Sequence, residues 1–168
     1  MDIPDTVCSL TQLQETMTSG NKLCIPGDYP ICLSSEINIY LQDCDYSLIS
    51  SNTITGNSYG INAYSDNNDL TISENSISDN NTGIYLYDDN TNIDISGNEI
   101  VENSNYGIYL DYRYNSNIDI KQNTIMGNQA NGISFHSSSY GDIIENLIVN
   151  NGSYGLYLNQ INGGDCVV

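Results

Sequence analysis

The chain is 168 residues long, which favours a single domain. Its 3 Lys and Arg residues against 21 Asp and Glu residues give a formal net charge of −18, and so acidic a surface repels nucleic acid, anionic lipid and, without bridging metal ions, polyuronates. No stretch is long and apolar enough to span a bilayer, and residues 1–5 lack the basic start and apolar run of a secretory signal, which still fits a mature exported protein.

Residues 1–45 differ in pattern from the rest and predict a cap with a first, irregular coil. Ser9 and Gln12 fit a capping box, and a short amphipathic helix is expected over residues 10–18. Three apolar residues share one face of that helix: Leu10, Leu13 and Met17. Three strand-like runs follow: residues 23–25, 31–33 and 37–41.

Four of the five cysteines lie in this first segment: Cys8, Cys24, Cys32 and Cys44. Four cysteines allow three pairings, and their spacing does not choose among them. Their spacing matches no dependable zinc pattern, and no His lies nearby. We interpret them as a disulfide framework formed in an oxidising compartment, with buried free thiols as the alternative.

Residues 46–168 carry an internal repeat, which we assign to the same structural domain as the cap. One Asn recurs at intervals of 23, 23, 25 and 23 residues: Asn52, Asn75, Asn98, Asn123 and Asn146. A second Asn follows five residues later: Asn57, Asn80, Asn103, Asn128 and Asn151. A Gly comes next: Gly60, Gly83, Gly107, Gly132 and Gly155. A fixed period in this range indicates a solenoid.

Isoleucines mark three short strands in each repeat. One set precedes the first Asn by three residues: Ile72, Ile95, Ile120 and Ile143. Another follows that Asn by two: Ile54, Ile77, Ile100, Ile125 and Ile148. The last set follows the Gly: Ile61, Ile84, Ile108, Ile133 and Leu156. Apolar and polar residues alternate around them, which predicts a single-stranded, right-handed parallel β-helix of about five to six coils with strands roughly 4.8 Å apart.

The Asn and Gly columns have a physical role in such a coil. An Asn at the same corner of each turn can donate its amide to the Asn of the next turn, so the first column predicts a ladder. The Gly column fits a corner that needs either φ > 0 or close approach of backbone. The pattern resembles the parallel β-helix repeat family of pectate-lyase-like and NosD-like proteins over about residues 45–160. That resemblance implies a prokaryotic or archaeal surface protein, and it specifies fold far better than function.

Three tyrosines stand in the second position after the Gly: Tyr85, Tyr109 and Tyr157. Strand alternation points them outward. They are candidates for an interface with a neighbouring subunit or for stacking on sugar rings. The simplest alternative is that they have no such role and that Tyr is merely favoured in strands on a partly solvent-exposed face.

Three aspartates form another column: Asp94, Asp119 and Asp142. Stacked carboxylates repel each other, and Ca²⁺ would turn that repulsion into a binding site. Loops 66–69 and 88–90 offer further oxygens, and we treat Asn90 there as exposed. A solvated acidic face with Asx turns is the competing interpretation, and no cofactor other than Ca²⁺ is expected.

Evidence for catalysis is thin. Arg113, Lys121 and His136 are the only basic candidates besides Lys22 in the cap. His136 occupies the coil position that Asp111 holds one turn earlier, so the two are candidates for an acid–base pair. We therefore lean toward a protein without enzymatic activity.

The fifth cysteine, Cys166, lies far from the others, and we expect it to form an intermolecular bond. No amphipathic helix follows the last repeat, so we expect an open end that stacks on the cap of the next copy. The leading hypothesis is a non-catalytic, extracellular cell-surface protein whose partner is itself, assembled as a filament, sheath or surface layer with disulfide cross-links. The alternative is a carbohydrate-active β-helix module, a polysaccharide lyase, epimerase or sugar binder, with cell-surface polysaccharide as its partner.

Overall fold

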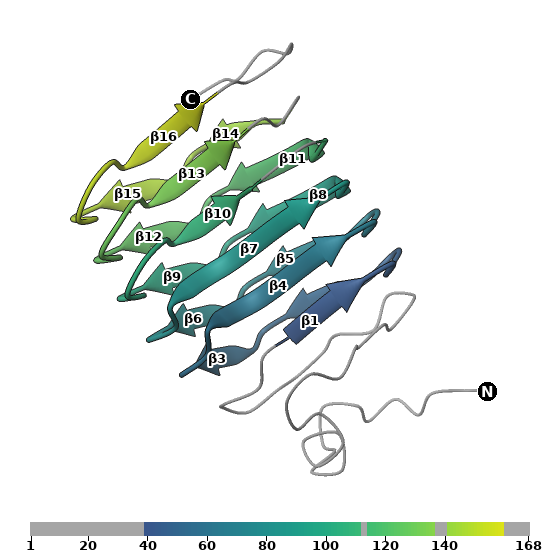
Figure 1. The fold of residues 1–168 in the computed structure, drawn as a ribbon. Coiled ribbons are helices and arrows are strands. Elements are labelled where there is room, and N and C mark those ends of the chain that lie inside the picture. The colour runs from purple at the N-terminus through teal and green to yellow at the C-terminus, as the bar shows by residue number, and fades with distance from the viewer. Residues whose placement is uncertain (1–38, 112–113, 137–140, 160–168) are drawn as a thin grey trace.

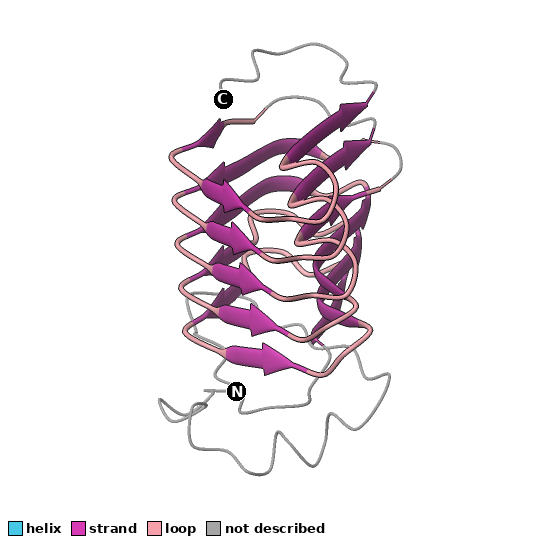
Figure 2. Cartoon of the chain, turned by 90° about the vertical axis from the view of Figure 1, so that its left-hand side faces the viewer, coloured by secondary structure: helices cyan, strands magenta, loops and turns pink. Residues whose placement is uncertain are grey.

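A computed structural model describes residues 39–111, 114–136 and 141–159. These residues form three parallel sheets around one core (Figures 1 and 2). Sheet 1 contains, in spatial order, β1 (Ile39–Gln42), β4 (Tyr59–Ser65), β7 (Thr82–Asp88), β10 (Ile108–Leu110), β13 (Ile133–His136) and β16 (Leu156–Asn159).

The other two sheets have five strands each, again all parallel. Sheet 2 contains β2 (Leu48–Ser50), β5 (Thr71–Ser73), β8 (Thr91–Ser96), β11 (Ser116–Lys121) and β14 (Ile143–Ile144). Sheet 3 contains β3 (Thr53–Thr55), β6 (Ser76–Ser78), β9 (Glu99–Val101), β12 (Thr124–Met126) and β15 (Leu147–Val149). Each turn visits the three sheets in succession, so the predicted parallel β-helix is confirmed, with about five turns. The expected helix over residues 10–18 lies outside the described residues.

Isoleucines fill the core in vertical columns, one for each sheet. Ile77, Ile100 and Ile125 pair in register across sheet 3, and all three are almost completely buried. The columns of sheets 1 and 2 are built in the same way, as the alternation in the sequence predicts. Each fully buried Ile contributes about 1.5–3 kcal/mol relative to exposure, so the columns supply most of the drive for folding.

Left-handed backbone turns the chain at all three corners, and it comes immediately before a buried or half-buried side chain. Before the first Asn column these residues are Ser51, Glu74, Gly97, Gln122 and Glu145. Before the second Asn column they are Gly56, Asp79, Glu102, Gly127 and Asn150. At the third corner they are Asp43, Asp66, Asp89 and Tyr114, and a second left-handed set follows three residues later: Tyr46, Asp69, Asn92 and Asn117. Most of these are not glycine, so each corner stores some backbone strain that the packing around it must offset.

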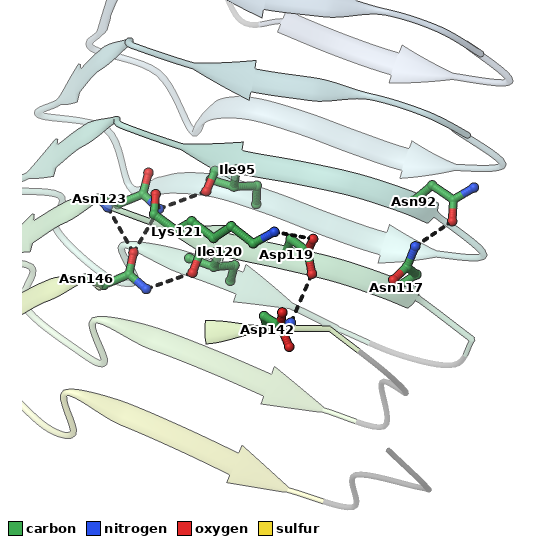
Figure 3. A network of polar contacts seen from close by, with 9 residues as sticks. All are labelled: Asn92, Ile95, Asn117, Asp119, Ile120, Lys121, Asn123, Asp142 and Asn146. Carbon is green, nitrogen blue, oxygen red and sulfur yellow. Dashed lines mark hydrogen bonds and ion pairs between the residues drawn. The ribbon is translucent and has the colours of Figure 1, made fainter. Parts of the chain in front are cut away.

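The predicted first Asn column is a continuous hydrogen-bonded ladder. The amide nitrogen Nδ2 of Asn98 donates to Oδ1 of Asn123 at 2.9 Å and to the carbonyl oxygen of Ile72 at 2.8 Å. The backbone N–H of Asn98 also donates to Asn123 Oδ1, and Asn75 binds Asn98 in the same way. The Asn123–Asn146 rung and its bonds to Ile95 and Ile120 are visible in Figure 3. Each side chain therefore satisfies backbone groups of its neighbours as well as its own.

Two further ladders occupy the remaining corners. The second column bonds in the same way from Asn57 to Asn151. A third ladder joins Asn67, Asn90 and Asn115, and it begins where the backbone N–H of Cys44 donates to Asn67. Our interpretation of Asn90 as exposed is wrong, because this side chain is fully buried in the third ladder.

The Gly column serves close approach rather than positive φ. None of the glycines in this column has a positive φ, and the left-handed residues stand at other positions of the repeat. A Cβ atom on Gly83 would lie 2.6 Å from the carbonyl oxygen of Gly107 and 2.7 Å from Cγ2 of Ile100. The second corner is therefore too tight for any side chain at this position.

We predict that Asn98→Leu lowers the free energy of unfolding much more than Asn81→Leu. Asn98→Leu orphans buried groups on both neighbouring coils, each at about 1–3 kcal/mol, whereas Asn81 is exposed and makes one long bond to Ser104. Asn90→Leu should resemble Asn98→Leu. Denaturation midpoints followed by circular dichroism test this, and equal midpoints for Asn98→Leu and Asn81→Leu would contradict the ladder's role.

Gly83→Ala should lower the free energy of unfolding by about 1–3 kcal/mol or more, because the added Cβ atom overpacks against backbone. The matched variant is Gly56→Ala, at a corner position with φ of 78° and no atom within 4 Å of the added Cβ. Gly56→Ala costs only the left-handed strain, about 1–2 kcal/mol at most, at a column that Asp79 and Glu102 already tolerate. Chemical denaturation measures the free energy of unfolding of both variants. A smaller loss of stability in Gly83→Ala than in Gly56→Ala would refute close packing at this corner.

Candidate functional site

The three tyrosines singled out in the sequence lie on the outer face of sheet 1. Tyr85 and Tyr109 pair in register, while Ser134 separates Tyr109 from Tyr157. All three rings are half-buried. They are partly buried because the tyrosines that immediately precede the Gly column, Tyr59, Tyr106 and Tyr154, pack against them.

Neighbouring rings on this face stack rather than stand apart. Tyr59 lies 4.7 Å from Tyr85 between ring centroids, with an interplanar angle of 17°. Tyr106 lies 4.5 Å from Tyr109 at 20°, and Tyr85 lies 5.5 Å from Tyr109 at 27°. The faces of these rings are thus turned toward other rings. Because a sugar stacks on a free aromatic face, this arrangement argues against a stacking platform for carbohydrate.

Asp111 lies beside two of the stacked tyrosines, Tyr85 and Tyr109. The hydroxyl of Tyr85 donates to Asp111 Oδ2 at 3.3 Å. Burial raises the pKa of Tyr85 and of Tyr109, and the nearby Asp111 carboxylate adds to both increases. Both phenols therefore keep their protons well beyond the ordinary pH range, and neither is a ready nucleophile or base.

The proposed pair of Asp111 and His136 is not formed. No hydrogen bond or ion pair joins these two described residues, and Asp111 is engaged by Tyr85 instead. The His136 ring packs edge-on against Tyr109, 5.6 Å away, and lies 5.5 Å from Tyr157. Arg113 lies outside the described residues. The acid–base pair that the repeat suggested is therefore not assembled between these two described residues.

The aspartate column lies on the outer face of sheet 2 and is neutralised in part by one lysine. Asp94 and Asp119 pair in register. Lys121 Nζ donates to Asp119 Oδ2 at 2.6 Å, and the backbone N–H of Asp142 donates to the other oxygen at 3.0 Å (Figure 3). This ammonium lies close enough to all three carboxylates to relieve part of the repulsion for which Ca²⁺ was one candidate.

The pKa values of this pair shift as the contacts require. Burial alone raises the pKa of Asp119, but the Lys121 hydrogen bond, the Asp142 N–H and the lysine charge outweigh it, so the pKa is lowered. The hydrogen bond to Asp119 raises the pKa of Lys121 against an opposing effect of burial, and the charges of Asp119, Asp94 and Asp142 add to the increase. Both shifts favour the charged pair at neutral pH.

The acidic loops also bond from coil to coil. Asn92 donates to Asp69 at 3.2 Å, and Asn117 donates to Asn92 at 2.8 Å (Figure 3). Asn68 donates to Asp45 at 2.9 Å. Within the described ranges, no three His, Cys, Asp or Glu side chains converge in a way that could hold a metal ion. Calcium at Asp94, Asp119 and Asp142 therefore stays a hypothesis.

Cys44 is the one cysteine among the described residues. It is buried beneath the third ladder and is disulfide-bonded. Cys8, Cys24, Cys32 and Cys166 lie outside the described residues, so the pairing stays a prediction.

Exposed apolar side chains gather on the last turn that the structure describes. Leu147, Tyr154 and Leu158 are exposed there, and Met126 is exposed on β12 beside this turn. Ile148 and Leu156 continue core columns but are only partly buried. The described part of the chain contains no helix with the length and hydropathy that a membrane span requires.

Comparison with known proteins agrees with this architecture. A family model described as a right-handed beta helix region matches residues 31–164. Neither a search of curated proteins nor a search of solved structures finds a match.

We predict that Lys121→Met lowers stability at pH 7 in low salt by about 0.2–1 kcal/mol, the range for partly exposed ion pairs. A lowered carboxyl pKa contributes stability above the unfolded value, about 3.9, and loses it as the pH falls through the folded value. The difference between variant and wild type should therefore disappear in acid. Thermal unfolding at both pH values tests this, and a constant difference would place the lysine's effect in packing.

If calcium binds the aspartate column, millimolar Ca²⁺ should raise the melting temperature by mass action. The increase should be larger in Lys121→Met, where no ammonium competes for Asp119. Sodium chloride at equal ionic strength is the control for screening. No shift beyond that control in either protein would leave the aspartates a solvated acidic face.

Proposed function

The chain belongs to the right-handed β-helix family, and from this premise we propose that it is a non-catalytic structural protein of the cell surface that assembles by end-to-end stacking of its solenoid. Filament, sheath and surface layer are the forms such stacking would take. The observation that supports the proposal is the apolar exposure of the last described turn.

Part of this exposed apolar surface continues the core columns of the solenoid. Leu158 pairs with Phe135 in the inward column that also contains Leu86 and Leu110. Leu86 and Leu110 are completely buried by the coils on either side, whereas Leu158 is 39% exposed. A further coil placed on β16 would cover Leu158 as β13 and its neighbours cover Leu110. The same contact would cover the partly buried Ile148 and Leu156.

Electrostatics supports contact at the ends over contact along the sides. The chain carries a formal net charge of −18, so side-by-side approach of two copies brings like charges together. Two unlike ends form a heterologous contact, which repeats into an open filament unless the rotation closes a ring. The outer face of sheet 1, with Tyr85, Tyr109 and Tyr157, is a secondary candidate for lateral contact through ring edges and hydroxyls.

Disulfide bonding would make the joint covalent. Cys44 is already disulfide-bonded, which agrees with an oxidising, extracellular location. A bond from Cys166 to a cysteine of a neighbour's first segment would link consecutive copies, and it would replace one pairing within that segment, because two disulfides there leave no free thiol. The carbohydrate-active alternative has less support, because ring faces on sheet 1 are stacked and Asp111 and His136 are not paired.

Sedimentation velocity of the oxidised protein should reveal polymers that need both reductant and denaturant to dissolve. Cys166→Ser should give polymers that dissolve in denaturant alone. Leu158→Asp places a charge in the proposed end contact and should abolish polymers. Leu147→Asp, on the outer face of the same turn, is the matched control and should leave them intact.

Circular dichroism first establishes that both aspartate variants are folded. A wild-type protein that is monomeric under oxidising conditions, with Cys166 titrating as a free thiol, would overturn the proposal. Polymers lost in Leu147→Asp but not in Leu158→Asp would place the contact along the side of the solenoid instead.

A further inference from the structure

Seven tyrosines on the outer face of sheet 1 form one unbroken chain of neighbouring rings. They are Tyr40, Tyr59, Tyr64, Tyr85, Tyr87, Tyr106 and Tyr109. Centroid distances between linked rings run from 4.5 Å to 6.1 Å. The chain crosses β1, β4, β7 and β10, so it follows the solenoid axis through four successive strands.

The ring contacts place the tyrosines in a defined order along the solenoid. Tyr40 contacts Tyr64, Tyr64 contacts Tyr87, and Tyr87 contacts Tyr85. Tyr85 then contacts Tyr109, while Tyr59 and Tyr106 are side branches on Tyr85 and Tyr109. Beyond Tyr109 the next ring is the His136 imidazole, edge-on at 5.6 Å. An imidazole is harder to oxidise than a phenol, so the easily oxidised segment ends at Tyr109.

A proton acceptor is placed inside the chain. A tyrosine that loses one electron becomes a strong acid and must lose its phenolic proton. The Tyr85 hydroxyl already donates to the Asp111 carboxylate at 3.3 Å, so that proton has a destination without a large movement of either group. Neighbouring rings in near contact then provide the path for the electron.

From this geometry we infer that the tyrosine chain collects one-electron oxidation and delivers it to Tyr64 as the site of covalent modification. A one-electron oxidant, of the class of peroxidase ferryl haems or ruthenium(III) complexes, takes an electron from Tyr85, and the proton moves to Asp111. Tyr85 regains an electron from Tyr87, which is refilled by Tyr64, and the proton returns from Asp111 to Tyr85. The net change is loss of one electron from Tyr64 to the oxidant and of its phenolic proton to water.

Tyr64 is the exit because it is the most exposed ring of the seven, at 39%, while the others are half-buried. Two tyrosines outside the chain provide internal references. Tyr46 and Tyr114 are 66% and 69% exposed and have no ring partner among the described residues. If exposure alone governs radical formation, these two must be modified more than Tyr64. If the chain feeds Tyr64, the order is reversed.

The experiment uses the full chain at low concentration, without a reductant, because a reductant would consume the oxidant and the tyrosyl radicals. Ruthenium(III) tris-bipyridyl, photogenerated with persulfate as electron acceptor, is the oxidant, and nitroso-tert-butane is the radical trap. Peptide mapping by mass spectrometry measures trap adducts at each tyrosine. We expect several-fold more adduct at Tyr64 than at Tyr46 or Tyr114. Adduct yields that follow exposure would overturn the inference.

Two conservative variants separate electron transfer from packing. Tyr87→Phe keeps the stacked ring but removes the phenol between Tyr64 and the rest of the chain, so the Tyr64 adduct should fall toward the level at Tyr46. Tyr106→Phe removes a phenol at the end of a side branch and should leave most of the Tyr64 adduct. Equal yields in these variants would also overturn the inference, and the outcome does not depend on whether the protein polymerises.

Discussion

The whole structure depends on satisfying backbone groups that are buried at the corners of each turn. An isoleucine core leaves no room for water at a bend, and a buried unpaired amide or carbonyl costs about 1–3 kcal/mol. Asparagine meets the requirement because its short side chain carries both a donor and an acceptor and can serve two neighbouring coils at once. The side chain of Asn98, for example, forms hydrogen bonds with Asn75, Asn123, Ile72 and Ser96. Three such ladders fix the vertical register of every sheet, and the isoleucine columns follow from that register.

Much of this interior could be predicted from the sequence because the interior is periodic. The intervals between Asn52 and Asn146 are the same as the intervals between paired strands of sheets 2 and 3, so the period alone places the ladder and the isoleucines of those sheets. The third ladder was missed although Asn67 and Asn90 show the same 23-residue step. Asp residues surround both asparagines, and an acidic, polar stretch has the composition of an exposed loop. The position of the left-handed residues was also missed, since Asp, Glu and Gln give no sign of that conformation.

The outer surface could be predicted only in part, because there the outcome depends on contacts between different positions. Alternation correctly places Tyr85 and Tyr109 outside, yet it says nothing of Tyr59 and Tyr106, which come from the corner and cover them. Likewise, Asp94 and Asp119 form the expected column, but Lys121 is two residues from Asp119 and changes its electrostatics. In a repeat protein, an outward residue that recurs in each turn forms a column along the sheet. Neighbouring residues that do not recur, such as Lys121, then determine the chemistry of that column.

The unequal spacing of the repeats has a consequence for how such a protein can change. Most rungs join residues 23 apart, but Asn90 and Asn115 are 25 apart, and so are Asn98 and Asn123. The strands on either side remain in register, so the additional residues are absorbed in corners such as that between β10 and β11. Insertions and deletions there leave the core untouched. A lineage, or a protein engineer, could therefore lengthen that corner into a displayed loop without redesigning the scaffold that carries it.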